Sequence, residues 1–218
     1  MKGRKFRRAV VRIGQRLTRQ GVVGNYEGNI SVLDRKNGRL FITPSGKSKE
    51  LLTERMILMT DRKGNVTEGM RGLRSSSEIG MHVRLYELRP DIGAIVHCHA
   101  PFCTAFAVNH TPVVTDALAE CAILFGGEIP LLPYGEPGTE HIIDGYEQHL
   151  DKNVVLLANH GLLALGKDPE EAYALSVSAE LLCKTLFLSR IMGQNVPIPK
   201  ELQGELSQWH RKQAERTQ

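Results

Sequence analysis

Two histidines stand one residue apart in the segment IVHCHAP, residues 95–101. In a β-strand, residues two apart point to the same face, so a strand over 92–99 would place His97 and His99 together and Cys98 on the opposite face. Two imidazoles on one strand face can bind a single metal ion. Catalytic zinc sites usually have three protein ligands and one open position. The spacing therefore indicates a metal site that needs a third ligand, although each histidine could instead be a hydrogen-bonded core residue.

His160 is the candidate for that third ligand. It follows the apolar run 154–158 in the segment LLANHGLL, so a neighbouring strand of the same sheet could bring it beside the pair. One other histidine, His82, would share a helix face with Ile79, Val83 and Tyr86, which favours packing in the core. The remaining histidines also lack a partner at ligand spacing: His110, His141, His149 and His210.

The segment RSSSEIGMH has two interpretations. Ser75 and Glu78 form the S-x-x-E pattern of a capping box at a helix start. In the alternative, Ser76, Ser77 and the first backbone N–H groups of the helix bind an anion, and Glu78 points into the same site as a proton acceptor. The capping interpretation explains the pattern completely by itself.

Two glycine-containing turns add to the case for an anion. EGNIS at 27–31 and TPSGK at 43–47 both offer free backbone donors beside a hydroxyl or amide. Neither matches G-x-G-x-x-G or the Walker pattern, so nucleotide binding has no support. Three such segments before an HxH strand favour a small, phosphate-bearing, metal-chelating substrate.

These motifs need a mixed α/β framework with a central sheet. Apolar runs bounded by turn residues predict strands at 29–33, 39–43, 57–60, 92–99, 129–132, 154–158 and 162–165. Several are joined by tight turns, which favours antiparallel pairing. Helical periodicity predicts helices at 5–20, 76–88, 139–150 and 168–192. The last of these starts with Asp168-Pro169-Glu170-Glu171, which is typical of a helix N-terminus.

Composition bounds the class of protein. The chain has 218 residues, 41% hydrophobic and 24% charged, so we expect a single domain over 1–218 with a polar C-terminal tail at 196–218. No apolar run or leader suggests a membrane or secreted protein, and four scattered cysteines suggest reduced thiols in the cytoplasm. Residues 1–20 hold eight Lys or Arg. We interpret them as the solvated face of a helix, with no nucleic acid or membrane partner.

Taken in order, GNIS, ITPSG, SSE, HCHA and ANHG resemble the signature of the class II aldolase/adducin family, over about residues 5–192. The resemblance implies a three-layer α/β/α fold around a largely antiparallel sheet. It also implies a homotetramer with four-fold symmetry and active sites near the subunit interfaces.

The resemblance also assigns roles to residues. The family's zinc ligands fall on His97, His99 and His160, and its catalytic acid/base falls on Glu78. The phosphate site falls on six residues: Gly28, Asn29, Ser45, Gly46, Ser76 and Ser77.

The implied reaction is retro-aldol cleavage of a ketose 1-phosphate, such as L-fuculose 1-phosphate, to dihydroxyacetone phosphate and an aldehyde. Zn²⁺, or another divalent metal, would stabilise the enediolate charge, and no organic cofactor is needed. A pKa raised toward neutrality by burial would help Glu78 to move the proton.

The chain departs from the family pattern in two places. Aldolases of this family carry a tyrosine four residues after a proline, whereas here Pro112 is followed at that distance by Asp116. They also use a tyrosine near the C-terminus as a proton donor, and residues 190–218 contain none. Asp116 is therefore a candidate catalytic residue. Glu120 and His210 are further candidates for acid/base work, although loop and tail residues mostly face solvent.

These departures leave alternatives open. A sugar-phosphate 4-epimerase uses the same retro-aldol step on a ketose 5-phosphate such as L-ribulose 5-phosphate, and has an aspartate near the position of Asp116. A dehydratase and a decarboxylase of sugar phosphates are further relatives with similar metal sites. A non-catalytic, adducin-like module is another reading, but it would have no physical need of three converging histidines and Glu78.

Overall fold

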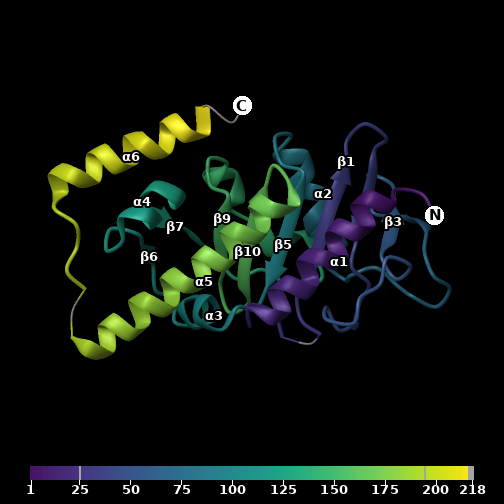
Figure 1. Cartoon of the computed structure of the whole chain (residues 1–218), viewed down its shortest axis with the longest axis horizontal. Coiled ribbons are helices and arrows are strands. Elements are labelled where there is room, and N and C mark those ends of the chain that lie inside the picture. The colour runs from purple at the N-terminus through teal and green to yellow at the C-terminus, as the bar shows by residue number, and fades with distance from the viewer. Residues whose placement is uncertain (25, 194, 216–218) are drawn as a thin grey trace.

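The protein is built around one large sheet (Figure 1). The computed structural model describes residues 1–24, 26–193 and 195–215, with the backbone alone at Ser207 and at 210–215. The sheet has eight strands in the order β4-β3-β2-β1-β5-β10-β9-β8. Their bounds are β1 Asn29–Asp34, β2 Arg39–Ile42, β3 Leu58–Thr60, β4 Val66–Glu68, β5 Ala94–Cys98, β8 Leu131–Leu132, β9 Val154–Leu157 and β10 Gly161–Gly166. All neighbours pair antiparallel except β8 and β9, which are parallel.

Helices cover both faces of this sheet. On one face lie α1 (Arg4–Arg19), α3 (Pro101–Val108) and α5 (Pro169–Met192), packed on Cys98, Leu162 and other residues of one large core cluster. On the other face lie α2 (Ile79–Leu88) and two 3₁₀ turns, η1 (Glu140–Ile143) and η2 (Tyr146–His149), packed on Ile95 and Leu163. Successive strand residues thus face opposite layers. This is the three-layer α/β/α arrangement with a largely antiparallel sheet that the sequence predicts.

Helix α5 is the longest element of the described chain and begins as predicted. The Asp168 carboxylate accepts hydrogen bonds of 2.9 Å from the backbone N–H groups of Glu170 and Glu171, which caps the helix. By length and hydropathy alone α5 is apolar enough to cross a membrane. In the structure, however, Ala172, Leu175 and other residues of one face are buried in the core. Burial of this face accounts for part of the apolar composition, while large apolar side chains of the C-terminal half of α5 are exposed.

Several predicted elements differ in the structure. The helix predicted at 139–150 is split into η1 and η2, because Gly145 between them has a φ of 91°. The strand predicted at 129–132 is divided at Pro130, which has no N–H to donate. Its halves pair separately: β7 (Glu128–Ile129) with β6 (Val113–Val114), and β8 with β9.

The C-terminal tail contains a helix that the sequence analysis did not predict. Helix α6 (Lys200–Glu215) lies beside the short helix α4 (Ala119–Phe125), after a segment that turns away from the end of α5 (Figure 1). The backbone N–H of Ile198 in this segment donates to the carbonyl of Asp116 at 2.8 Å. The tail is thus folded back onto the region of β6, α4 and β7. Helix α3 and strand β4 were also not predicted.

Candidate active site

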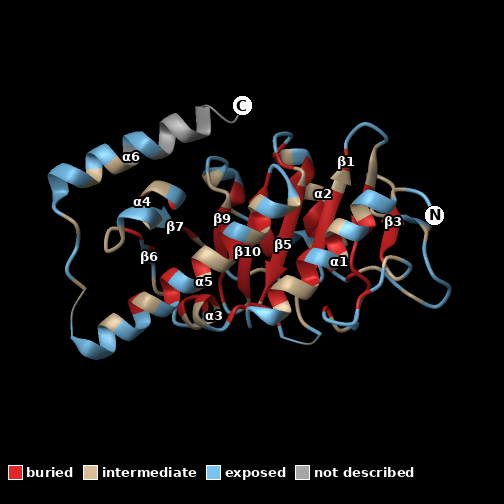
Figure 2. Ribbon diagram, viewed as in Figure 1, coloured by how far each residue is buried: buried red, intermediate tan, exposed pale blue. Residues whose placement is uncertain are grey.

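The candidate site is organised by β5, the strand of the HxH motif. His97 is paired across one side with Asn29 of β1 and across the other with Leu163 of β10. These central strands are buried, as are the neighbouring strands β9 and β3 (Figure 2). His99 is one residue beyond the end of β5, yet its ring lies with its centroid 5.2 Å from that of His97. The side chain of Cys98 lies in the core on the opposite face, as the alternation predicts.

Two glycines allow neighbouring segments of the chain to approach β5 closely. Gly28 has a φ of 74°, and a Cβ atom there would lie 2.5 Å from the carbonyl oxygen of His97. At Gly161 a Cβ atom would lie 2.6 Å from the carbonyl oxygen of Cys98. A side chain at either position would push the backbone away from the strand that carries the histidines.

His160 is aimed by the turn between β9 and β10. Asn159 adopts a left-handed conformation with a φ of 55°, which asparagine tolerates better than most residues. The His160 N–H donates to the Leu157 carbonyl at 3.0 Å, closing the turn. The His160 Nε2 atom then lies 2.9 Å from His97 Nε2 and 3.3 Å from His99 Nε2.

The three imidazoles have the properties of metal ligands. One nitrogen of each lies within 4.8 Å of the others, and among the described residues these three form the one such group of His, Cys, Asp or Glu. His97 Nδ1–H donates to the Leu162 carbonyl at 2.9 Å, which leaves the Nε2 lone pair facing the other rings. Burial lowers the pKa of His97 to about 4, and burial and the nearby His160 also lower that of His99. Three imidazole nitrogens that converge in this way suit a divalent transition metal.

Glu78, just before α2, faces this cluster. Its Oε1 atom lies 3.2 Å from His160 Nε2, and its Oε2 atom lies 3.4 Å from His97 Nε2. The side-chain amide of Asn29 donates to Oε2 at 2.6 Å. Burial acts to raise the pKa of Glu78, but the hydrogen bonds from His160 and Asn29 and the neighbouring His97 outweigh it. The net pKa lies well below its usual range, opposite to the expected direction.

The capping-box interpretation of Glu78 is wrong. No side-chain hydrogen bond caps α2, and the Glu78 carboxylate is turned toward the histidines. Ser76 Oγ accepts a hydrogen bond of 3.3 Å from the Glu78 N–H, and Ser75 forms an isolated bridge with Pro44. The helix starts at Ile79, three residues later than predicted.

That bridge joins the 43–47 turn to the serine segment. The N–H of Ser45 donates to the Arg74 carbonyl at 2.9 Å, so the 43–47 turn lies against the serine segment. Beside them is a cavity of about 210 Å³. Its walls include every residue predicted to bind phosphate, Gly28, Asn29, Ser45, Gly46, Ser76 and Ser77, together with Glu78, His99 and His160. The anion-binding motifs and the histidine cluster therefore share one pocket.

Lys49 is a residue of this pocket that the sequence analysis missed. It is the one Lys or Arg in the cavity wall and is only 1% exposed. Its Nζ atom donates to the Tyr26 carbonyl at 2.8 Å. Burial lowers the pKa of Lys49 to about 8, against the opposing effect of Glu27 and Glu78. The segment GKSKE holds two lysines, and their spacing alone does not reveal which one turns inward.

The structure does not bring Asp116 into this pocket within one chain. Asp116 follows β6 and is absent from the residues of the cavity wall, while Glu120 is exposed in the first turn of α4. The His210 side chain lies outside the described residues. The roles suggested for these three residues stay predictions.

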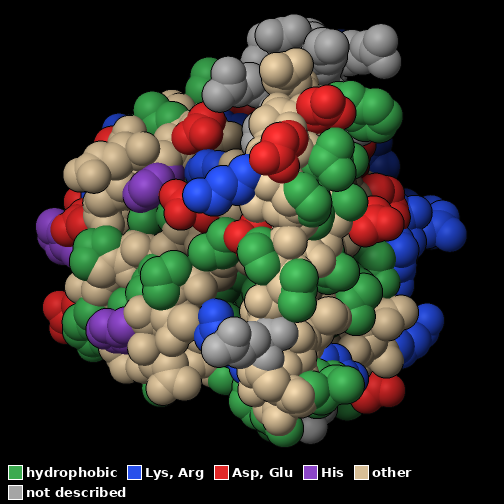
Figure 3. Space-filling model, turned by 90° about the vertical axis from the view of Figure 1, so that its left-hand side faces the viewer, with side chains coloured by type: hydrophobic (Ala, Val, Ile, Leu, Met, Phe, Trp, Pro, Cys, Tyr) green, Lys and Arg blue, Asp and Glu red, His purple; other side chains and the backbone are tan. Residues whose placement is uncertain are grey.

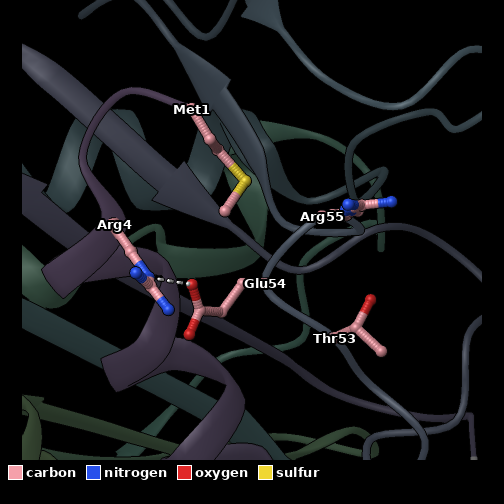
Figure 4. A pocket seen from close by; sticks show the side chains of 5 residues that line it. All are labelled: Met1, Arg4, Thr53, Glu54 and Arg55. Atoms are coloured by element: carbon pink, nitrogen blue, oxygen red, sulfur yellow. Dashed lines mark hydrogen bonds and ion pairs between the residues drawn. The ribbon is translucent and has the colours of Figure 1, made fainter.

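A second hollow of about 610 Å³ lies near the N-terminus and has no such chemistry. It is lined by Met1, Arg4, Thr53, Glu54 and Arg55. Arg4 and Glu54 point toward each other across it and form an ion pair of 3.1 Å (Figure 4). Its wall contains no histidine or cysteine, and Glu54 is its one carboxylate. We assign it no part in the site.

Comparison with known proteins identifies the family to which this chain belongs. The model of the "Class II Aldolase and Adducin N-terminal domain" matches residues 8–187. The chain belongs to the class II aldolase and adducin family. This confirms the family, fold class and enzyme class expected from the sequence.

Individual relatives give the comparison more detail. The chain is 30% identical over 200 residues to a 5-deoxy-D-ribulose 1-phosphate aldolase of Bacillus thuringiensis, covering 90% of this chain and 91% of the relative. It is 32% identical over 199 residues to an L-fuculose phosphate aldolase of Escherichia coli, covering 91% and 90%. A solved L-fuculose 1-phosphate aldolase has a TM-score of 0.87 at 29% identity, covering 98% of both chains.

Proposed function

We propose that this protein is a metal-dependent aldolase that cleaves a ketose 1-phosphate to dihydroxyacetone phosphate and an aldehyde. One observation carries the proposal: Glu78, His99 and His160 line the cavity formed by the anion-binding turns, and the buried His97 lies against Glu78 and His160. A proton acceptor, a metal site and a phosphate site within one small cavity are what this reaction needs.

The phosphate would be bound far from the bond that breaks. The Ser45, Ser76 and Ser77 segments offer hydroxyl and N–H donors, and Lys49 adds a positive charge to the same wall. Binding energy from this anchor is used to orient the reacting carbons toward Glu78.

Glu78 would move the proton at the carbon next to the ketone. Its low pKa keeps it ionised and able to accept a proton, and its hydrogen bond from Asn29 fixes the carboxylate plane. A divalent ion held by His97, His99 and His160 would supply Lewis-acid stabilisation of the negative charge on the substrate oxygens. We propose Zn²⁺ as this ion, because three neutral imidazoles are a common catalytic zinc set.

The chemistry of two relatives guides the choice of substrate. The relatives named above act, by their names, on 5-deoxy-D-ribulose 1-phosphate and on L-fuculose 1-phosphate. Both are ketose 1-phosphates that share the half that becomes dihydroxyacetone phosphate. We propose an L-fuculose 1-phosphate-like substrate whose aldehyde half is set by residues outside the described pocket.

A 4-epimerase acting on a ketose 5-phosphate is the second candidate. One observation favours it: Asp116 stands where the aldolases of the family have tyrosine. In this alternative Asp116 would act on the aldehyde half, and because it does not line the pocket of its own chain it would have to come from a neighbouring subunit.

We also propose a cytoplasmic homotetramer. The C-terminal half of α5 exposes a set of large apolar side chains: Leu181, Phe187, Leu188, Ile191 and Met192. Apolar side chains also appear among charged ones on the face that Figure 3 shows, at the end of the molecule where α5, α4 and α6 lie. Subunit contacts would cover such side chains. Sedimentation velocity of the full chain tests the subunit number.

The decisive experiment incubates the purified, zinc-loaded protein with a panel of ketose 1-phosphates and 5-phosphates. Dihydroxyacetone phosphate from a 1-phosphate supports the aldolase. Conversion of a 5-phosphate to its epimer without net cleavage supports the second candidate. Absence of both products from a protein with bound metal would reject catalysis and favour an adducin-like module.

A further inference from the structure

A chain of buried polar side chains lies behind Glu78. Asn29 and Ser31 are two residues apart on β1 and point to the same face. His82 and Tyr86 follow Glu78 at intervals of four residues, on one face of α2. The side chains of the strand and the helix meet between the two elements, and none of these residues is more than 7% exposed. The placement of His82 in the core is thus as expected, but its ring is not packed among apolar groups alone.

The hydrogen bonds connect all of these side chains in one line. Ser31 Oγ lies 3.0 Å from the Tyr86 hydroxyl and 2.7 Å from His82 Nδ1. The other ring nitrogen, His82 Nε2, is hydrogen-bonded to Asn29 Oδ1. The line ends where Asn29 Nδ2 meets Glu78 Oε2 at 2.6 Å.

The chemistry of the groups fixes the direction of every bond. An ionised Glu78 has no hydrogen to give, so the amide nitrogen of Asn29 must donate to it, and the amide oxygen is left as an acceptor. That oxygen requires a proton on His82 Nε2. His82 Nδ1 is then the acceptor of a neutral ring, so Ser31 donates to it and accepts from Tyr86. Burial lowers the pKa of His82 to about 3, which agrees with a neutral ring.

We propose that His82 is a positioning residue: its Nε2–H holds the Asn29 amide in the one orientation that presents N–H to Glu78. The inference rests on the proposed function, since a proton-accepting Glu78 must be ionised. Without this donor the amide could rotate by half a turn and place its oxygen against the carboxylate. Repulsion would then replace a short, charge-assisted hydrogen bond, and Glu78 would lose its fixed position.

Two substitutions separate this role from simple filling of the core. His82→Leu keeps an apolar side chain at the site but removes both ring nitrogens. His82→Gln retains an N–H group that can donate to Asn29 Oδ1. Tyr146→Phe is the matched control, because the Tyr146 hydroxyl is also buried in this layer and hydrogen-bonded, to Arg89 and the Lys152 carbonyl.

The kinetic measurement compares kcat and KM of the zinc-loaded variants with those of the wild type. We expect His82→Leu to lower kcat by roughly 10²-fold, the effect of a displaced catalytic group, with KM and metal content unchanged. His82→Gln should recover at least about a tenth of the wild-type kcat, and Tyr146→Phe should keep it. Wild-type kcat in folded His82→Leu, or equal losses in the Leu and Gln variants, would overturn the proposal.

A second measurement needs no turnover. In wild-type protein labelled with ¹⁵N-histidine, the side-chain signals of His82 report which ring nitrogen carries the proton; the signals absent from His82→Gln identify the residue. A proton on Nε2 supports the proposal, and a proton on Nδ1 or on both nitrogens overturns it. If the wild-type protein shows this tautomer but cleaves no sugar phosphate, the proposed function fails and the hydrogen-bond chain remains.

Discussion

The two regions with candidate catalytic residues are built in opposite ways. In the first, strands β1, β5 and β10 and the start of α2 hold Glu78 and His97 in buried, hydrogen-bonded positions. In the second, Asp116 lies between a two-residue strand and a short helix, and is contacted by the segment that leads to α6. Rigid elements fix a reacting group within a narrow range, whereas peripheral segments tolerate change.

This contrast matches the pattern of departures from the family. The motifs predicted to bind metal and phosphate are all present, and they lie in the first region or, for the 43–47 turn, against it. Asp116, the aspartate that replaces tyrosine, lies in the second region. Residues 190–218, which contain no tyrosine, begin at the end of α5 and lead into the same region. We infer that the first region provides the chemistry common to the family and that the second adapts it to a particular aldehyde half. Substitutions at the metal ligands, Glu78, Lys49 and Asp116 test this division.

The largest effect is expected from the metal ligands. His97→Ala, or His160→Ala, should lower metal affinity by more than roughly 10²-fold and abolish turnover, because removing a ligand costs more than removing its supporting contact. Inductively coupled plasma mass spectrometry would measure the metal, which we expect at about one ion per wild-type chain. His141→Ala is the control, since its ring is exposed and pairs with Asp144, away from the cavity. Full metal content in His97→Ala would exclude this site.

The next effect is expected at Glu78. Glu78→Gln should lower kcat by something on the order of 10²–10⁴-fold, the contribution of general acid–base catalysis. It should leave metal content and phosphate binding near wild type, because the amide still fits beside Asn29. Exchange of the dihydroxyacetone phosphate proton with deuterium, followed by NMR, isolates this step. Undiminished exchange in the variant would remove Glu78 from the mechanism.

Lys49 should affect binding more than turnover. A hydrogen bond or ion pair to a charged group contributes about 1.5–3 kcal/mol, so Lys49→Met should weaken phosphate binding by roughly tenfold to a hundredfold. The pKa of Lys49 is about 8, so the ammonium is present below that pH and is lost as pH rises through it. The wild-type affinity for dihydroxyacetone phosphate should therefore fall above pH 8.

Lys49→Met should lack this fall in affinity, as titration calorimetry across the pH range would show. Lys47→Met is the matched control, because Lys47 is exposed and only two residues away in the same turn. An equal loss of affinity in both variants would assign the effect to general charge and not to the pocket.

The smallest effect is expected in the second region. Asp116→Asn should lower the rate of cleavage by about tenfold, below the usual range for a positioned acid or base, because its side chain is only partly buried. Proton exchange on dihydroxyacetone phosphate should not change, because that half reaction uses Glu78. A change in exchange as large as that in cleavage would remove the distinction between the two regions.

The sequence predicted the first region well because its signals are local and periodic. The spacing of His97 and His99 follows directly from strand geometry, and the apolar runs around His160 and β10 are clear. The start of α5 was also predictable, since the cap at Asp168 is a short-range interaction.

The failures have equally specific causes. An S-x-x-E segment looks the same whether its carboxylate caps a helix or reaches Asn29, which is 49 residues away in the chain. The helical pattern at 139–150 does not show that Gly145 adopts a positive φ. The hydrogen bonds of His82 join two elements more than 50 residues apart, so helix periodicity alone reports only that the residue is inside.

The double pairing of β5 has a consequence for how the protein acquires its ion. Strand β5 is paired on both sides, so its backbone amides should exchange hydrogen with solvent only through large openings of the structure. Because such openings are rare, the histidines should keep their positions before a metal ion binds. Little conformational entropy is then lost on binding. Chelation should therefore leave a folded, reloadable protein, unlike small zinc-dependent domains that unfold when stripped.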